Sequence, residues 1–224
     1  MASLRDNGAE SCSGDKCGAS LPRAAFDGDD FAGADFPPVL NARLALPGED
    51  VFETACAAAV SGELGAADLL WSFDGAWLRL AVILEPDIPA SDAARARDVM
   101  LLAATDALAA LLPPQVAIGA SGDTLIINGA KAGHVRMALP DDCQEQAIPQ
   151  WLATGVDLHL RAPGRTEPGH DTLNTALSEE GGAHLSAAIA ASAIARHFLS
   201  WLDTWIHEGI RPMVIALRAF SEDH

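Results

Sequence analysis

Lys131 is the residue of this sequence best suited to bind an anion. It is the only lysine after Lys16, and Gly133 follows two positions later, where the lack of a side chain lets backbone approach another group closely. The run Thr124–Ile127 is apolar, and the Asn128-Gly129 pair after it tolerates the positive φ of a type I′ turn. The segment therefore predicts a hairpin that holds a lone cation on a rigid strand, an arrangement that suits a carboxylate or a phosphate.

The composition indicates an acidic globular protein. Its 224 residues include 14 Lys plus Arg against 31 Asp plus Glu, which gives a formal net charge of −17, and 50% of the residues are hydrophobic. Phosphate backbones and anionic membrane surfaces repel such a charge, and no cluster of Lys and Arg offsets it. We therefore expect that the protein binds no nucleic acid and no membrane.

The cysteines and the first residues indicate a reduced, cytoplasmic protein. Cys12 and Cys17 are spaced Cys-x4-Cys without a second pair, which is weak support for zinc or a disulfide. Cys56 lies in an Ala-rich helical stretch and is typical of a small core residue. No apolar segment follows Arg5 as it would in a secretory signal, and no stretch approaches the roughly 18 apolar residues of a membrane span.

Composition and periodicity divide the chain into a leader and one domain. Residues 1–36 are rich in Gly, Ala, Ser and Asp and predict a flexible acidic leader, whereas residues 37–224 predict a folded domain. The apolar patterns predict helices over 51–60, 91–112, 185–207 and 212–220. They predict strands over 68–73, 77–85, 115–118, 124–127, 130–139 and 151–161. Because strands and helices do not alternate regularly, the expected class is α+β, with a mostly antiparallel mixed sheet flanked by helices.

The hairpin resembles the signature of the biotin/lipoate A/B protein ligase family, in which an Asp and a hairpin precede Lys-x-Gly or Lys-x-x-Gly. The matching residues here are Asp123, Lys131 and Gly133. The order of the expected elements over roughly residues 38–218 is also similar to that of the ligase catalytic domain. In addition, Asn174–Gly181 looks like the family segment before the closing helices. The resemblance implies a divergent biotin protein ligase-like catalytic domain.

This resemblance implies two-step acyl transfer. In the family, ATP with magnesium activates the carboxylate of biotin, lipoate or octanoate as an acyl-adenylate, which a lysine of a carrier domain then attacks. The implied partners are therefore a small carboxylic acid and an acyl-carrier domain. By the resemblance, Lys131 is the catalytic cation that neutralises the carboxylate and phosphate oxygens. Asp123, Gly133 and Gly155 are the implied ligand-binding residues.

The chain departs from the family pattern at the phosphate loop. Biotin ligases carry Gly-Arg-Gly-Arg-x-Gly after the first strand, whereas the segment from Trp71 to Trp77 holds no Arg and one Gly. Each lost charge-assisted contact to a phosphate costs about 1.5–3 kcal/mol. One alternative function is thus an inactive ligase-fold scaffold or interaction protein, in which Trp71 or Trp77 fills the pocket. Another is an acyltransferase that uses Cys143, although the acidic loop around this cysteine would raise the thiol pKa.

Structural explanations also exist for these residues. Lys131 suits a solvated charge on a strand, and the side chain of Asp123 can cap its own turn. His134, His159 and His170 lack a metal-ligand spacing such as His-x3-His. We therefore expect surface or loop roles for the histidines and no metal site.

Overall fold

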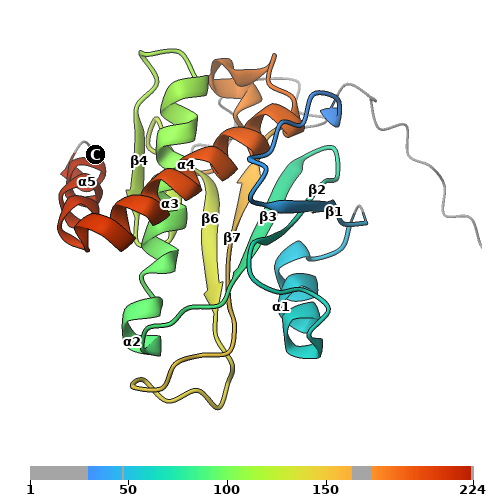
Figure 1. Cartoon of the computed structure of the whole chain (residues 1–224). Coiled ribbons are helices and arrows are strands. Elements are labelled where there is room, and N and C mark those ends of the chain that lie inside the picture. Colours follow the sequence, from blue (N-terminus) through green and yellow to red (C-terminus); the bar gives the residue numbers. More distant parts are fainter. Residues whose placement is uncertain (1–29, 47, 163–172, 223–224) are drawn as a thin grey trace, which may run out of the picture.

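A seven-stranded mixed sheet forms the centre of the computed structural model, which describes residues 30–46, 48–162 and 173–222 (Figure 1). The strand order is β1-β2-β3-β7-β6-β5-β4. Among these strands the β1–β2 pair is parallel and the other five pairs are antiparallel, which confirms the predicted α+β class. The strands are β1 (Asn41–Leu44), β2 (Asp68–Phe73), β3 (Trp77–Leu84), β4 (Ile118–Ser121), β5 (Thr124–Ile127), β6 (Ala130–Ala138) and β7 (Leu152–His159).

Helices cover the two faces of this sheet unequally. On one face α3 and α4 cross in front of the strands, and α5 packs beside them, whereas α1 packs on the opposite face against β2, β3 and β7 (Figure 1). The helices are α1 (Val51–Ser61), α2 (Ala90–Ala93), α3 (Ala96–Leu111), the π-helical turn η2 (Ser178–Gly182), α4 (Ala187–Glu208) and α5 (Arg211–Glu222).

Strand alternation places most of the buried apolar residues in two cores, and a small third cluster holds Ala93, Ala96 and Leu152. Successive side chains of a strand point to opposite faces, so Leu78, Leu80 and Val82 of β3 pack in the large core under α3 and α4. Ala81 and Ile83 of the same strand pack in the smaller core under α1. Val156 and Leu158 of β7, and Leu160 just after it, also lie in the large core. α1 thus covers only part of its face of the sheet.

Local sequence signals explain where most elements begin and end. Asp50 caps α1, because its side chain accepts hydrogen bonds from the N–H groups of Phe52 and Glu53 at 3.0 and 3.1 Å, and the helix ends at Gly62 with φ 74°. The predicted helix over 91–112 is divided into α2 and α3. The strand expected over 115–118 begins only at Ile118, because residues 113–116 form a turn in which the N–H of Val116 donates to the Pro113 carbonyl.

The predicted hairpin between β5 and β6 is confirmed, with φ values of 48° at Asn128 and 83° at Gly129. The register shifts beside Leu125, so that Leu125 pairs with Gly133 and Ile126 with Lys131. Directly opposed residues of neighbouring strands share a face. This bulge therefore places Lys131 on the face of Ile126, which is the face that α1 partly covers.

Residues 30–36, which the sequence analysis assigned to the leader, contact the domain. Arg161 donates to both carboxylate oxygens of Asp30, and the rings of Phe31 and Phe36 each lie 5.6 Å from that of Trp71. Residues 1–29, with Cys12 and Cys17, and residues 163–172, with His170, lie outside the described part of the chain. In the described part, none of the helices combines the length and the apolar character needed to cross a membrane.

Candidate ligand-binding site

A row of polar residues crosses the face of the sheet that α1 leaves partly open. Strand register places Ser72 opposite Arg79, Arg79 opposite Asp157, Asp157 opposite His134 and His134 opposite Thr124. These five residues therefore share one face, and we call them the polar row. The Ser72 side chain is fully buried without a hydrogen-bond partner for its hydroxyl, whereas His134 keeps 34% of its side-chain surface exposed. The row runs from a buried end to an accessible end.

The arginine of this row, Arg79, binds to the turn between β2 and β3. Arg79 donates to Asp74 at 2.6 Å, and Asp74 also accepts hydrogen bonds from the N–H groups of Ala76 and Trp77 at 3.0 and 2.7 Å. Burial opposes the charge on Asp74, but the hydrogen bonds from Trp77 and Arg79 hold its pKa below the usual value. The place of the family's phosphate loop is thus a short turn whose nearby arginine already has a carboxylate partner.

Arg136 of β6 is at the centre of a cluster of charges on this face. Its guanidinium donates to Asp50 at 2.5 and 2.9 Å, and it lies 3.3 Å from Asp157 and 3.7 Å from Glu53. It also lies over the ring of Phe52, 4.6 Å from the centroid. Burial raises the pKa of Asp157, although the positive charges of Arg136 and His134 act in the opposite direction. Arg136 therefore joins the start of α1 to the polar row.

The Arg136 hydrogen bond lowers the pKa of Asp50 from 3.8 to about 2. Ionised Asp50 therefore stabilises the fold above pH 3.8, and this contribution is lost as the pH falls through about 2. Because 48% of the Asp50 side chain is exposed, we expect the contribution to be only about 1 kcal/mol after screening.

We predict that Asp50→Asn lowers the free energy of unfolding by about this amount at pH 7 and flattens its dependence on acid pH. Urea unfolding at a series of pH values measures this, with exposed Glu63→Gln as the charge-matched control. An unchanged pH profile in Asp50→Asn would contradict the prediction.

Both predicted site glycines have a packing reason to lack a side chain. A Cβ at Gly133 would clash with the carbonyl oxygen of Asp157 on β7. A Cβ at Gly155 would lie 2.6 Å from the carbonyl oxygen of Leu80 and 3.0 Å from the ring of Phe52. The ring of Phe52 therefore covers Gly155, which lies on the face of the polar row. A role of either glycine in ligand binding stays a prediction.

Lys131 is exposed and forms no ion pair with a described residue. Its backbone is fixed on both sides, since its N–H donates to the Leu173 carbonyl and its carbonyl accepts from the Thr175 N–H, both at 2.9 Å. Asp123 is an exposed turn residue whose carbonyl accepts from the N–H of Val135. Val135 lies four residues along β6 from Lys131, which corresponds to about 13 Å. The structure thus brings Lys131, but not Asp123, onto the end of the face near His159.

The two tryptophans proposed to fill the pocket lie on opposite faces. Trp77 stacks on His159 with the ring centroids 4.6 Å apart, and His159 Nδ1 lies 3.0 Å from the Thr175 carbonyl oxygen. Trp71 is buried in the large core on the other face. Only Trp77 can therefore occupy the candidate site.

Cys143 is not brought to this site. It lies on the connection after β6, whereas Lys131 lies near the start of that strand. The seven residues from Lys131 to the end of β6 span about 23 Å. A mechanism that uses both residues on one ligand is not supported by this placement.

Sequence reasoning missed the charged residues that build this face. Arg79, Arg136 and Asp157 each interrupt an apolar strand at a position facing away from the large core. A polar residue at alternate positions of a mostly buried strand was the available signal. Within the described residues, no three His, Cys, Asp or Glu side chains are grouped as a metal site would require.

Comparison with known proteins shows which family this chain belongs to. Residues 36–218 match the model of the biotin/lipoate A/B protein ligase family. A solved biotin protein ligase-like protein of unknown function from Silicibacter sp. TM1040 is 32% identical, with a TM-score of 0.75, covering 84% of this chain and 80% of that one. No protein with a curated description matches the sequence.

Ligases of known specificity share the fold at low identity. The biotin protein ligase of Aquifex aeolicus is 12% identical with a TM-score of 0.63, and 80% of this chain and 76% of that chain are covered. The Leishmania major enzyme in complex with biotinyl-5-AMP is 15% identical with a TM-score of 0.56, covering 83% of this chain and 81% of that one. The extent of the family match, together with the Silicibacter protein, shows that this chain belongs to the biotin/lipoate A/B protein ligase family.

Proposed function

We propose that this domain binds a small carboxylic acid, or its acyl-adenylate, at the Lys131 end of the polar row, and transfers the acyl group to a lysine of a carrier domain. Relatives with the same fold bind biotin with ATP, or biotinyl-5-AMP, in their solved complexes. Biotin, lipoate and octanoate are therefore the candidate substrates, and ATP with magnesium is the candidate cosubstrate.

The main support for this proposal is that the charge of Lys131 is available to bind a ligand. On the same face, Arg79 is paired with Asp74, and Arg136 is paired with Asp50 and Asp157. Lys131 has no carboxylate partner among the described residues, and its fixed backbone holds it at the accessible end of the face. An exposed cation on a rigid strand is free to form a charge-assisted hydrogen bond to an anionic ligand.

The proposed reaction has two balanced steps. First, a carboxylate oxygen of the acid attacks the α-phosphorus of ATP, which forms the acyl-adenylate and releases pyrophosphate. Second, a neutral lysine amine attacks the acyl carbon, which forms an amide, releases AMP and gives up one proton. Lys131 would stabilise the negative charge shared by the carboxylate and phosphate oxygens during the first step. Mg²⁺ would bind as its complex with ATP.

Ligand binding tests the proposal directly. We expect ATP with Mg²⁺ and one acid of the panel biotin, lipoate and octanoate to raise the melting temperature of the wild type. Lys131→Met keeps the aliphatic stem but removes the charge, so we expect it to weaken binding by about tenfold or more. Arg218→Met, which removes an exposed charge of α5, is the control and should keep the wild-type response. No ligand-dependent shift in the wild type would reject the binding claim.

One observation favours a second candidate, the inactive scaffold. The ring of Phe52 covers Gly155, and Arg136 is held over that ring by Asp50. This arrangement fills part of the face that a ligand would need. The scaffold predicts no ligand-dependent rise in melting temperature in either the wild type or Lys131→Met, so the same measurements separate the two candidates.

A further inference from the structure

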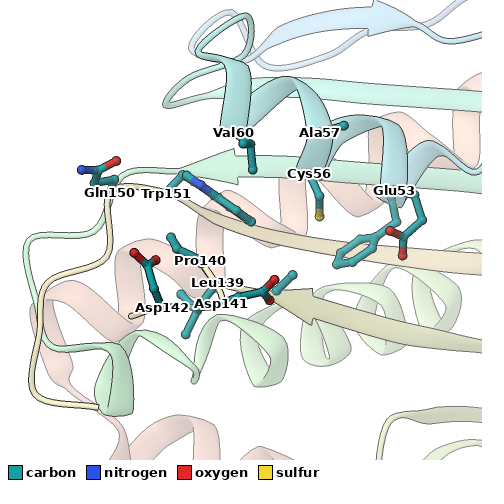
Figure 2. Close-up of a pocket in the computed structure, with 12 residues that line it drawn as sticks. Glu53, Cys56, Ala57, Val60, Leu139, Pro140, Asp141, Asp142, Gln150 and Trp151 are labelled. Carbon is teal, nitrogen blue, oxygen red and sulfur yellow. The ribbon is translucent and has the colours of Figure 1, made fainter. Parts of the chain in front are cut away.

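A separate cavity lies at the far end of β6, between α1 and the connection from β6 to β7 (Figure 2). Its volume is about 590 Å³, within the usual range for small-molecule sites. Ala138 lines it and lies seven residues along β6 from Lys131, a separation of about 23 Å. The cavity therefore lies far from Lys131, although Phe52 and Glu53 belong both to its lining and to the Arg136 cluster, and its interpretation does not depend on the proposed function.

The charges around this cavity are all negative. Glu53 of α1 and Asp141 and Asp142 of the facing connection line it, and none of the described residues in its lining is a Lys, Arg or His. Asp141 and Asp142 are exposed and form no ion pair with a described residue. The nearest guanidinium, that of Arg136, lies 3.7 Å from Glu53 but is bound in a fork by Asp50. Asp141 and Asp142 thus place a negative potential over a concave surface, and no ion pair with a described residue offsets it.

The rest of the lining is mostly apolar and includes one polar side chain, that of Gln150. Figure 2 shows Trp151 at one end of the cavity and the Cys56 sulfur projecting from α1 toward the opposite wall. Burial raises the pKa of the Cys56 thiol to about 11, and the nearby charge of Glu53 acts in the same direction. The thiol is therefore neutral at pH 7, and the site disfavours a negative charge. The ring of Trp151, which is half-buried, can cover methylene groups or a cation.

The arrangement of the carboxylates favours an organic cation over a metal ion. No three of the acidic, His or Cys side chains in the described residues are close enough to hold a metal ion. A primary ammonium, in contrast, can be bound by one or two carboxylates when its alkyl chain also packs against an apolar wall. We propose that this cavity binds a primary alkylammonium group, with Asp141 or Asp142 at the ammonium, Glu53 adding to the negative potential and Trp151 against the alkyl chain. The source is either a free amine or a lysine side chain of a partner protein.

Titration with n-butylammonium chloride, followed by NMR at the Trp151 indole N–H, tests this proposal at constant ionic strength. Trp151→Phe assigns the resonance. A ligand of this size should bind with a Kd of about 1 mM. Its neutral isostere n-butanol should bind at least about tenfold more weakly, because it lacks the charge. Asp141→Asn with Asp142→Asn should weaken binding of n-butylammonium by about tenfold. The matched control is Glu63→Gln with Glu145→Gln, which removes the same charge at exposed positions outside the cavity.

A second titration distinguishes the two sources of the ammonium group. Tighter binding of the blocked tripeptide Gly-Lys-Gly than of n-butylammonium would assign the cavity to a protein lysine. Equal or weaker binding of the tripeptide would assign it to a free amine. The proposal is overturned if neither ligand gives a saturable shift at Trp151. It is also overturned if Asp141→Asn with Asp142→Asn weakens binding of n-butylammonium no more than Glu63→Gln with Glu145→Gln does.

Discussion

Replacing Arg136 with Met is expected to lower the free energy of unfolding by about 3 kcal/mol. The change leaves the carboxylate of Asp157, only 12% exposed, without the guanidinium that lies 3.3 Å from it. It also removes the fork to Asp50 and the contact over the Phe52 ring. Removing one partner of a buried pair is costly because the other charge stays buried. Urea unfolding at pH 7 measures the loss.

Two further variants separate this explanation from a general loss of surface charge. Arg196→Met removes an arginine that is 51% exposed and lies 3.8 Å from an exposed Asp35, so its cost should be below about 1 kcal/mol. Adding Asp157→Asn to Arg136→Met removes the stranded carboxylate and should restore part of the stability. Equal losses in Arg136→Met and Arg196→Met would contradict the account of the charge cluster.

Gly133→Ala is expected to cost about 2–3 kcal/mol, because the new methyl group would overlap the backbone carbonyl of Asp157. β6 and β7 are neighbouring strands in the middle of the sheet, so neither can move away without disturbing its other pairings. The clash can therefore be relieved only by a shift of backbone. Chemical denaturation followed by circular dichroism gives the magnitude.

Gly65→Ala is the matched control for this prediction. Its Cβ would lie 3.0 Å from Glu85 Oε1, the end of a flexible side chain that can move aside. We therefore expect a cost below about 1 kcal/mol. If Gly133→Ala were as mild as Gly65→Ala, the close approach of β6 and β7 at this position would be wrong.

Short-range signals were sufficient to predict most of the elements. The Asn128-Gly129 turn, the start of α1 at Val51 and the apolar periodicity of α4 each depend on a few neighbouring residues, and each is present in the structure. β1 was not predicted, because Asn41–Leu44 is an exposed edge strand of four residues whose alternating pattern contains only two apolar positions. Its pairing with β2 depends on a contact between segments far apart in the sequence.

The candidate site could be predicted only in part for the same reason. Lys131 was identified from a local pattern, but the polar row exists because the registers of four strand pairings align Ser72, Arg79, Asp157, His134 and Thr124. Register between distant strands is set by packing of the whole sheet, which no local pattern contains. The position of Phe52 over Gly155 likewise depends on how α1 docks on the sheet.

The central claim is that Lys131 takes part in the activation of a small carboxylic acid by ATP. Exchange of labelled pyrophosphate into ATP tests this claim most directly. With Mg²⁺ and a panel of biotin, lipoate and octanoate, at least one acid should support exchange above the acid-free background. Lys131→Met should reduce that exchange by about tenfold or more, since it loses a charge-assisted contact to the reacting oxygens, whereas Arg218→Met should retain it. Exchange that no acid supports, or that Lys131→Met leaves unchanged, would contradict the claim.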